Sequence, residues 1–99
     1  MPKLLPPIHP GQTIKEDCLA PAGMSVNQLA KHLKITPARL NDIVRGRRGI
    51  TADTAMRLAR YFGTTAEFWM GLQLRYDLEL AEQKSLARIR REVRPSKAA

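Results

Sequence analysis

Four arginines lie close together near the middle of the chain: Arg39, Arg45, Arg47 and Arg48. Residues 37–50 contain a single acidic residue, Asp42, so this stretch carries a net charge of +3. A guanidinium group donates two parallel hydrogen bonds to guanine O6 and N7, or to the oxygens of a phosphate. Arginines in an acid-poor stretch therefore indicate a protein that binds a polyanion, and nucleic acid is the first class to consider.

The residue types that catalyse reactions or bind metals are scattered. His9 and His32 have no histidine or cysteine at metal-ligand spacing, and Cys18 is the single cysteine, so no internal disulfide is expected. Glu16 and Asp17 are adjacent and would face different sides of a helix, which argues against a pair of carboxylates for acid–base chemistry. The sequence predicts no enzyme, no metal and no cofactor.

Length and composition agree with a small globular protein. The chain has 99 residues, a formal net charge of +8, 43% hydrophobic and 26% charged residues, which is ordinary for one folded domain. No apolar run approaches the ~20 residues that cross a bilayer, and the first residues lack the apolar core of a signal peptide. We therefore expect a soluble cytoplasmic protein without a membrane partner.

Two short helices joined by a tight turn are predicted to position the arginines. Ser25 and Gln28 have the spacing of a capping box, so the first helix of this pair begins there. Thr36 is a good N-cap and Pro37 suits the first helical position, so a second helix begins there; it runs to about Arg45 and ends at Gly46. The apolar faces of the two helices would be formed by Leu29, Ala30, Leu33, Leu40, Ile43 and Val44. This pattern is typical of a helix-turn-helix, although paired capped helices also occur in other all-α proteins.

Three further helices complete the predicted fold. Prolines exclude a helix before about residue 10, and a first helix then runs from Gly11 to about Pro21. Thr51 caps the fourth helix, while either Thr64 or Thr65 caps the fifth. The predicted class is all-α with five helices. Its expected parts are an irregular arm over residues 1–9, a DNA-binding domain with a dimerisation helix over 10–80, and a basic helix end and tail over 81–99.

In a helix-turn-helix the second helix enters the major groove and the first crosses the backbone. The residues expected to face base edges are Pro37, Ala38, Arg39, Asn41 and Asp42, with Arg39 as the main reader because it suits guanine. The residues expected to contact phosphates are Ser25, Asn27, Thr36, Arg45, Arg47 and Arg48, because helix N-termini and exposed arginines suit that role.

The fifth helix is apolar over a wider arc than one core needs. Aromatic and aliphatic side chains at helical spacing are more often core than interface. This helix has a second apolar row, formed by Met70, Leu74 and Leu78, which favours burial against a second copy of the chain. The predicted dimer interface consists of Phe68, Trp69, Met70, Leu72, Leu74 and Tyr76. Beyond it, residues 81–99 carry a net charge of +4, which suits either a solvated helix end or a contact with nucleic acid.

Five segments carry a more specific pattern: Ile8-His9-Pro10-Gly11, Ser25-Val26-Asn27-Gln28-Leu29-Ala30, Ile43 to Ala55, Arg57 to Thr64, and Glu67-Phe68-Trp69. Together they resemble the HigA antitoxin family, which is also called the VapI-type antidote group and belongs to the Xre/Cro helix-turn-helix proteins with a lambda-repressor-like fold. The resemblance spans about residues 8 to 80, so the basic tail lies outside it.

The resemblance implies a bacterial antitoxin that neutralises a RelE-like, mRNA-cleaving toxin of the HigB type. It also implies a homodimer that binds a palindromic operator and represses its own toxin–antitoxin operon. Many proteins of this group have glutamine at the first groove-facing positions, where this chain has Pro37 and Ala38. Base reading would then depend on Arg39, on Asn41 or on DNA shape.

Two alternatives remain open on the sequence. One is a repressor of the same fold that has no toxin partner. The other is a toxin-binding inhibitor with little DNA binding, for which the proline-rich arm and exposed helix faces are the candidate surfaces. A ribonuclease is disfavoured because no histidine, tyrosine or carboxylate group converges in the sequence.

Overall fold

A computed structural model describes residues 5–97. The first helical segment is one continuous rod made of α1 (Pro10–Thr13), a π-helical stretch (Ile14–Leu19) and α2 (Ala20–Ala22). The wider turn lies just before Pro21, which has no N–H to donate to the preceding turn. Gly23 then ends the rod in the left-handed conformation, with φ of 60°. The described part of the arm, residues 5–9, is not helical, as the prolines predict; residues 1–4 lie outside the described residues.

Four more helices follow: α3 (Val26–Leu33), α4 (Pro37–Val44), α5 (Ala52–Phe62) and α6 (Ala66–Glu92). Each begins at a serine or threonine whose hydroxyl accepts a hydrogen bond from the backbone N–H three residues on. Thr65 is the cap of α6, which decides between the two neighbouring threonines. Counting the first rod once, residues 5–97 form five helices and no strand, so the predicted all-α class is confirmed.

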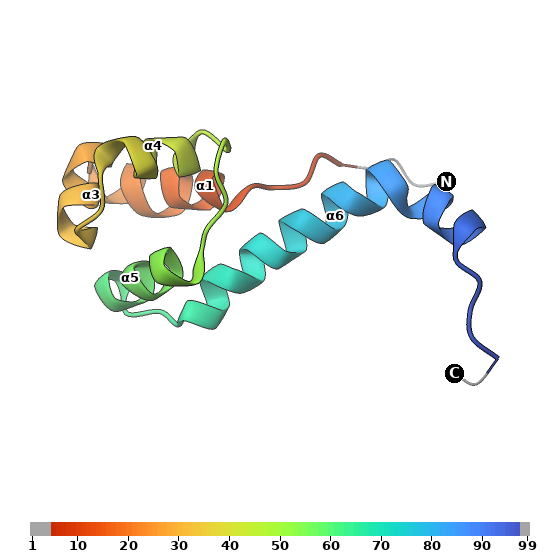
Figure 1. Cartoon of the computed structure of the whole chain (residues 1–99). Coiled ribbons are helices and arrows are strands. Elements are labelled where there is room, and N and C mark those ends of the chain that lie inside the picture. Colours follow the sequence, from red (N-terminus) through yellow and green to blue (C-terminus); the bar gives the residue numbers. More distant parts are fainter. Residues whose placement is uncertain (1–4, 98–99) are drawn as a thin grey trace.

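The core lies where the first rod, α3, α4 and α5 meet the beginning of α6 (Figure 1). It is formed by Ile14, Leu19, Leu29, Ala30, Leu33, Leu40, Ile43, Ile50, Ala55, Leu58 and Trp69. The apolar positions that helical spacing assigned to the faces of α3 and α4 are buried, apart from the half-buried Val44. This core fixes the orientation of α4 relative to the rest of the domain.

Helix α6 is much longer than the other helices. Its 27 residues correspond to about 40 Å, and only its first part packs on the domain, so the second part projects away from it (Figure 1). Residues of the arm lie along this helix: the ring of His9 meets that of Tyr76 edge-on at 4.8 Å, and Gln83 Nε2 donates to the Leu5 carbonyl. The helix ends at Glu92, three residues before Pro95. No helix among the described residues combines the length and apolar character that a membrane span requires.

Candidate nucleic-acid interface

The turn between α3 and α4 has the geometry of a helix-turn-helix. Ser25 and Gln28 form the predicted capping box: Gln28 N donates to Ser25 Oγ at 3.1 Å, and Ser25 N donates to Gln28 Oε1 at 2.8 Å. Lys34 ends α3 in the left-handed conformation, with φ of 59°. Thr36 Oγ1 then accepts from Arg39 N at 3.1 Å and opens α4. Two residues therefore separate the end of α3 from the cap of α4.

The first turn of α4 presents small side chains to solvent. Pro37 and Ala38 are exposed, whereas Leu40 and Ile43 are fully buried, so the helix turns its predicted groove-facing side outward. Ser25 and Asn27, at the beginning of α3, are exposed as well. Asn41 is half-buried one turn further along α4. Because the side chains of Pro37 and Ala38 are small and exposed, this surface can come close to base edges at the floor of a major groove.

Arg39 does not project freely from this surface. Its Nη2 donates to Thr54 Oγ1, to Asp53 Oδ2 at 3.2 Å and to Thr51 Oγ1 at 3.5 Å, all in the first turn of α5 or its cap. All three contacts use the same nitrogen. The interaction ties the beginning of α4 to the beginning of α5, a role that sequence reasoning missed because the partners are 12 to 15 residues away.

Asp42 also has a structural role. Its carbonyl accepts from Arg47 N at 2.8 Å and from Arg48 N at 3.2 Å, and its carboxylate lies 3.9 Å from Arg47 Nη1. Gly46, with φ of 78°, lets the chain turn there. We call residues 45–48 the arginine loop; Arg45, Arg47 and Arg48 are all exposed on it. Asp42 was predicted to face bases, and the structure places it where it shapes the loop.

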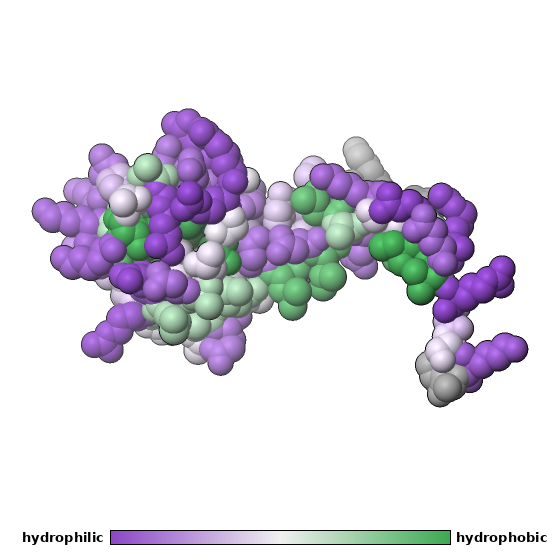
Figure 2. Space-filling model, in the orientation of Figure 1, coloured by the Kyte–Doolittle hydropathy of each residue, from purple (hydrophilic) through white to green (hydrophobic). Residues whose placement is uncertain are grey.

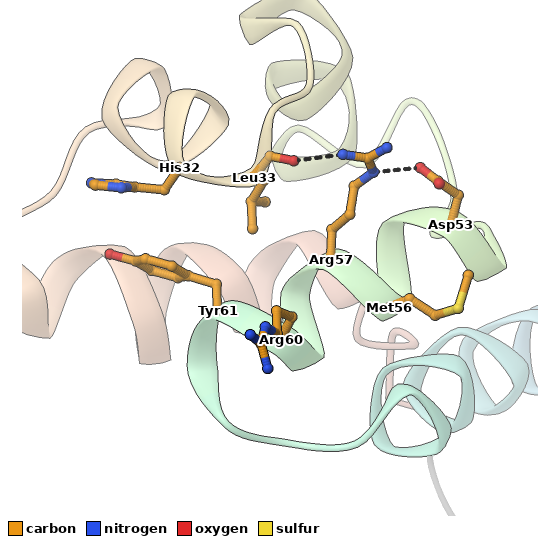
Figure 3. A pocket seen from close by; sticks show the side chains of 7 residues that line it. All are labelled: His32, Leu33, Asp53, Met56, Arg57, Arg60 and Tyr61. Atoms are coloured by element: carbon orange, nitrogen blue, oxygen red, sulfur yellow. Dashed lines mark hydrogen bonds and ion pairs between the residues drawn. The ribbon is translucent and has the colours of Figure 1, made fainter.

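Asp53 links two arginines that lie on different helices. Its carboxylate accepts from Arg57 Nε at 2.8 Å as well as from Arg39, and Arg57 Nη1 donates to the Leu33 carbonyl at the end of α3 at 3.0 Å (Figure 3). These hydrogen bonds, from Arg57 first and Arg39 second, hold the pKa of Asp53 below its ordinary value. The i,i+4 spacing of Asp53 and Arg57 is a signal that the sequence offered.

An open groove of about 530 Å³ lies between the end of α3 and one face of α5. Figure 3 shows His32 and Tyr61 stacked across it, with ring centroids 5.0 Å apart, and Arg57 at its other end. The groove holds no group of three histidine, cysteine or acidic residues, and none occurs elsewhere in residues 5–97.

Cys18 packs half-buried against the core, and burial together with Asp17 raises the pKa of its thiol. That favours a packing role for Cys18 over a nucleophilic one.

The predicted dimer interface divides into two sets. Trp69 was expected there, but its side chain is 1% exposed, so that prediction is wrong: Trp69 belongs to the core of its own protomer. Leu72 and Tyr76 are half-buried on the side of α6 that faces the domain. The other three members, Phe68, Met70 and Leu74, are exposed by 47%, 36% and 60%. They lie on exposed parts of α6 and stay the predicted interface.

His9 caps α1 through a neutral imidazole: its Nδ1 accepts from Gly11 N at 2.9 Å. Partial burial lowers the pKa of His9, although Asp77 acts in the opposite direction. Because the folded-state pKa lies below the unfolded value, the stabilising contribution is complete above about pH 6.5 and is lost as the pH falls through the lowered pKa. We expect His9→Asn, which keeps a capping acceptor that does not titrate, to reduce the loss of stability between about pH 7.5 and 5. Urea midpoints of both proteins at the two pH values test this, and an unchanged pH dependence would contradict it.

Comparison with known proteins places this architecture in a family. Residues 14–69 match the family described as "Helix-turn-helix". Virulence-associated protein I of Dichelobacter nodosus is 54% identical over 79 residues, which cover 80% of this chain and 73% of that protein.

Solved structures are similar over nearly the whole chain. The antitoxin HigA of Pseudomonas aeruginosa, solved with the higBA promoter, is 45% identical with a TM-score of 0.87, over 90% of this chain and 97% of that one. An addiction module antidote protein of the HigA family from Coxiella burnetii is 51% identical with a TM-score of 0.89, over 93% and 100% of the two chains. This chain therefore belongs to the Xre-type helix-turn-helix proteins and, within them, to the HigA antitoxin family.

Proposed function

We propose that this protein is an antitoxin that neutralises a cognate RelE-like, mRNA-cleaving toxin and, as a homodimer, binds a palindromic operator to repress its own operon. The observation that carries the DNA-binding part is the exposed first turn of α4 together with the exposed arginine loop at the other end of that helix. The P. aeruginosa antitoxin, which shares 45% of its residues, was solved with promoter DNA. A protein with this task acts in the cytoplasm, where the operator lies. The family is one of regulators, in keeping with the prediction that this chain is not an enzyme.

In this proposal α4 enters the major groove with Pro37 and Ala38 against the base edges. Arg39 reads a base through the part of its guanidinium that does not contact α5. Ser25, Asn27 and Thr36 bind phosphates near the N-termini of α3 and α4, and the arginine loop binds phosphates at the other end of α4. The groove-entering helices of two protomers would lie about 34 Å apart, one turn of the duplex.

We expect Arg39→Ala to lower affinity for operator DNA by about 1–3 kcal/mol relative to random DNA, because its charged hydrogen bond to a base is lost. Arg47→Ala should weaken both DNAs alike and lower the slope of log K against log salt by about 1.8, because one phosphate contact is lost from each protomer of the dimer. Fluorescence anisotropy with promoter DNA from upstream of the chain's own gene, and with a scrambled duplex, measures both effects.

Asp53→Asn is the control for Arg39, because it removes the ion pair with Arg39, together with that of Arg57, and leaves the Arg39 guanidinium in place. A base-reading role requires Asp53→Asn to keep most of the selectivity that Arg39→Ala loses. If both variants lose the same selectivity, the effect of Arg39 comes from its link to α5 and not from a base.

Dimerisation and toxin binding are tested together by light scattering after gel filtration. We expect the protein alone to have about twice its chain mass of 11.1 kDa, because Met70 and Leu74, four residues apart, form an exposed apolar face on α6, and Phe68 is exposed on another side of the helix. Coexpressed with the product of the neighbouring gene, it should elute as a larger complex. A dimer that binds DNA but captures no neighbouring gene product would instead support the repressor without a toxin partner.

A further inference from the structure

Residues 81–99 carry a net charge of +4 that the proposed groove contact does not use. Most of these cations lie on the projecting half of α6, which ends at Glu92, and all are exposed. Within the helix they are Lys84, Arg88, Arg90 and Arg91. The side of the helix on which they lie decides what they can contact.

One side of α6 begins beside Ile50, two residues after the arginine loop. Gln73 Oε1 accepts from Ile50 N at 2.7 Å, and Gln73 Nε2 donates to Asp77 Oδ1 at 2.9 Å. Residues seven apart in an α-helix lie on nearly the same side, within about 20°. Lys84 and Arg91 follow Asp77 at this spacing, so they share the side of α6 that faces the loop. Arg88, one turn after Lys84, lies at the edge of the same side.

The opposite side of the projecting half is apolar. Leu78, Ile89 and Val93 are exposed by 54%, 45% and 63%. Figure 2 shows the two sides separated over the last turns of α6, with hydrophilic residues along the upper edge and hydrophobic residues along the lower edge. The basic residues are therefore sorted onto one side and not spread around the helix.

Intramolecular pairing does not neutralise this basic side. Arg88 lies 3.9 Å from Glu92, and both side chains are more than 60% exposed, so the pair is weak. No ion pair with Lys84 or Arg91 occurs among residues 5–97. Their charge remains available to an anionic partner on the same side of the molecule as the arginine loop.

We propose that the side of α6 formed by Lys84, Arg88 and Arg91 is a second phosphate-binding element, which contacts DNA that flanks the operator. This inference rests on the proposed DNA-binding function. The 18 helical steps from Gln73 to Arg91 span about 27 Å of helix, equal to roughly eight base pairs of duplex. In this proposal α6 runs along the duplex away from α4, so its contacts lie beyond the base pairs that α4 reads and add affinity without sequence preference.

The test compares Lys84→Gln/Arg91→Gln with a matched control, Arg60→Gln/Arg75→Gln. The control removes two charges as well, from α5 and from the other side of α6. Each protein is titrated with two duplexes from upstream of the chain's own gene: the shortest that is bound selectively, and one extended by about ten base pairs, one helical turn, on each side.

We expect wild type and control to bind the long duplex more tightly and with a steeper salt dependence than the short one. Lys84→Gln/Arg91→Gln should bind the short duplex like wild type and lose about tenfold on the long duplex, with the salt slope lower by about 3.6, because two phosphate contacts are lost from each of the two protomers. Equal losses for test and control, or no loss on the long duplex, would overturn the inference and leave the proposed function standing. If wild type binds neither duplex selectively, both proposals fail.

Discussion

Replacing Trp69 by alanine should lower the free energy of unfolding by about 3–5 kcal/mol, the range for truncating a buried aromatic side chain. Trp69 is 1% exposed and packs between Phe62 and Phe68, with ring centroids 6.3 Å and 5.1 Å away. Its Nε1 donates to Thr64 Oγ1 at 2.7 Å, so the substitution also removes a hydrogen bond in the turn that leads into α6. Urea denaturation followed by circular dichroism gives the change.

Phe68→Ala is the matched control, because Phe68 is the adjacent aromatic residue and is 47% exposed. We expect a loss of about 1 kcal/mol or less from the fold itself, together with a weaker dimer. Unfolding measured at two protein concentrations separates these effects, since dimer stability depends on concentration and core packing does not. If Phe68→Ala costs as much as Trp69→Ala at both concentrations, the assignment of Trp69 to the core and Phe68 to an interface is wrong.

Sequence reasoning located the helices well because their signals are local. A serine or threonine cap acts on a backbone N–H three residues away, and glycine ends a helix at a single residue, so both can be recognised without the fold. The choice between Thr64 and Thr65 required the fold. The Thr64 hydroxyl accepts a hydrogen bond from the indole N–H of Trp69, whereas the Thr65 hydroxyl accepts from Phe68 N and caps α6.

The roles of individual site residues were harder to predict because tertiary neighbours decide them. Arg39 and Asp42 were both predicted to face DNA, and the structure gives each a further contact that the sequence did not predict: Arg39 with α5, and the Asp42 carbonyl with the arginine loop. Trp69 and Phe68 are adjacent in sequence, and only the packing of α6 on the domain determines which is buried. Helical periodicity assigns residues to a side of a helix, and it does not state whether the protomer or a second copy covers that side.

Gly11→Ala should destabilise the protein by about 3 kcal/mol, the upper end of the usual range for overpacking, because α1 contacts α4 with no room for a side chain. A Cβ at Gly11 would collide with the Ile43 carbonyl oxygen and would lie 2.9 Å from Val44 Cα. These are backbone atoms, which cannot rotate away as a side-chain end can, so overpacking must shift one helix against the other. The shift would act on the end of α4 next to the arginine loop, and DNA affinity should fall together with the urea midpoint.

Gly71→Ala on α6 is the opposite case, and it makes the argument testable. Gly71 is exposed, and a Cβ there meets no atom within 4 Å. Alanine is the better helix former, so we expect this substitution to raise stability by about 0.5–1 kcal/mol. Two changes of the same chemistry should therefore shift the urea midpoint in opposite directions. If Gly11→Ala unfolds at or above the wild-type midpoint, the close contact between α1 and α4 does not hold this domain together, and the position of α4 has another cause.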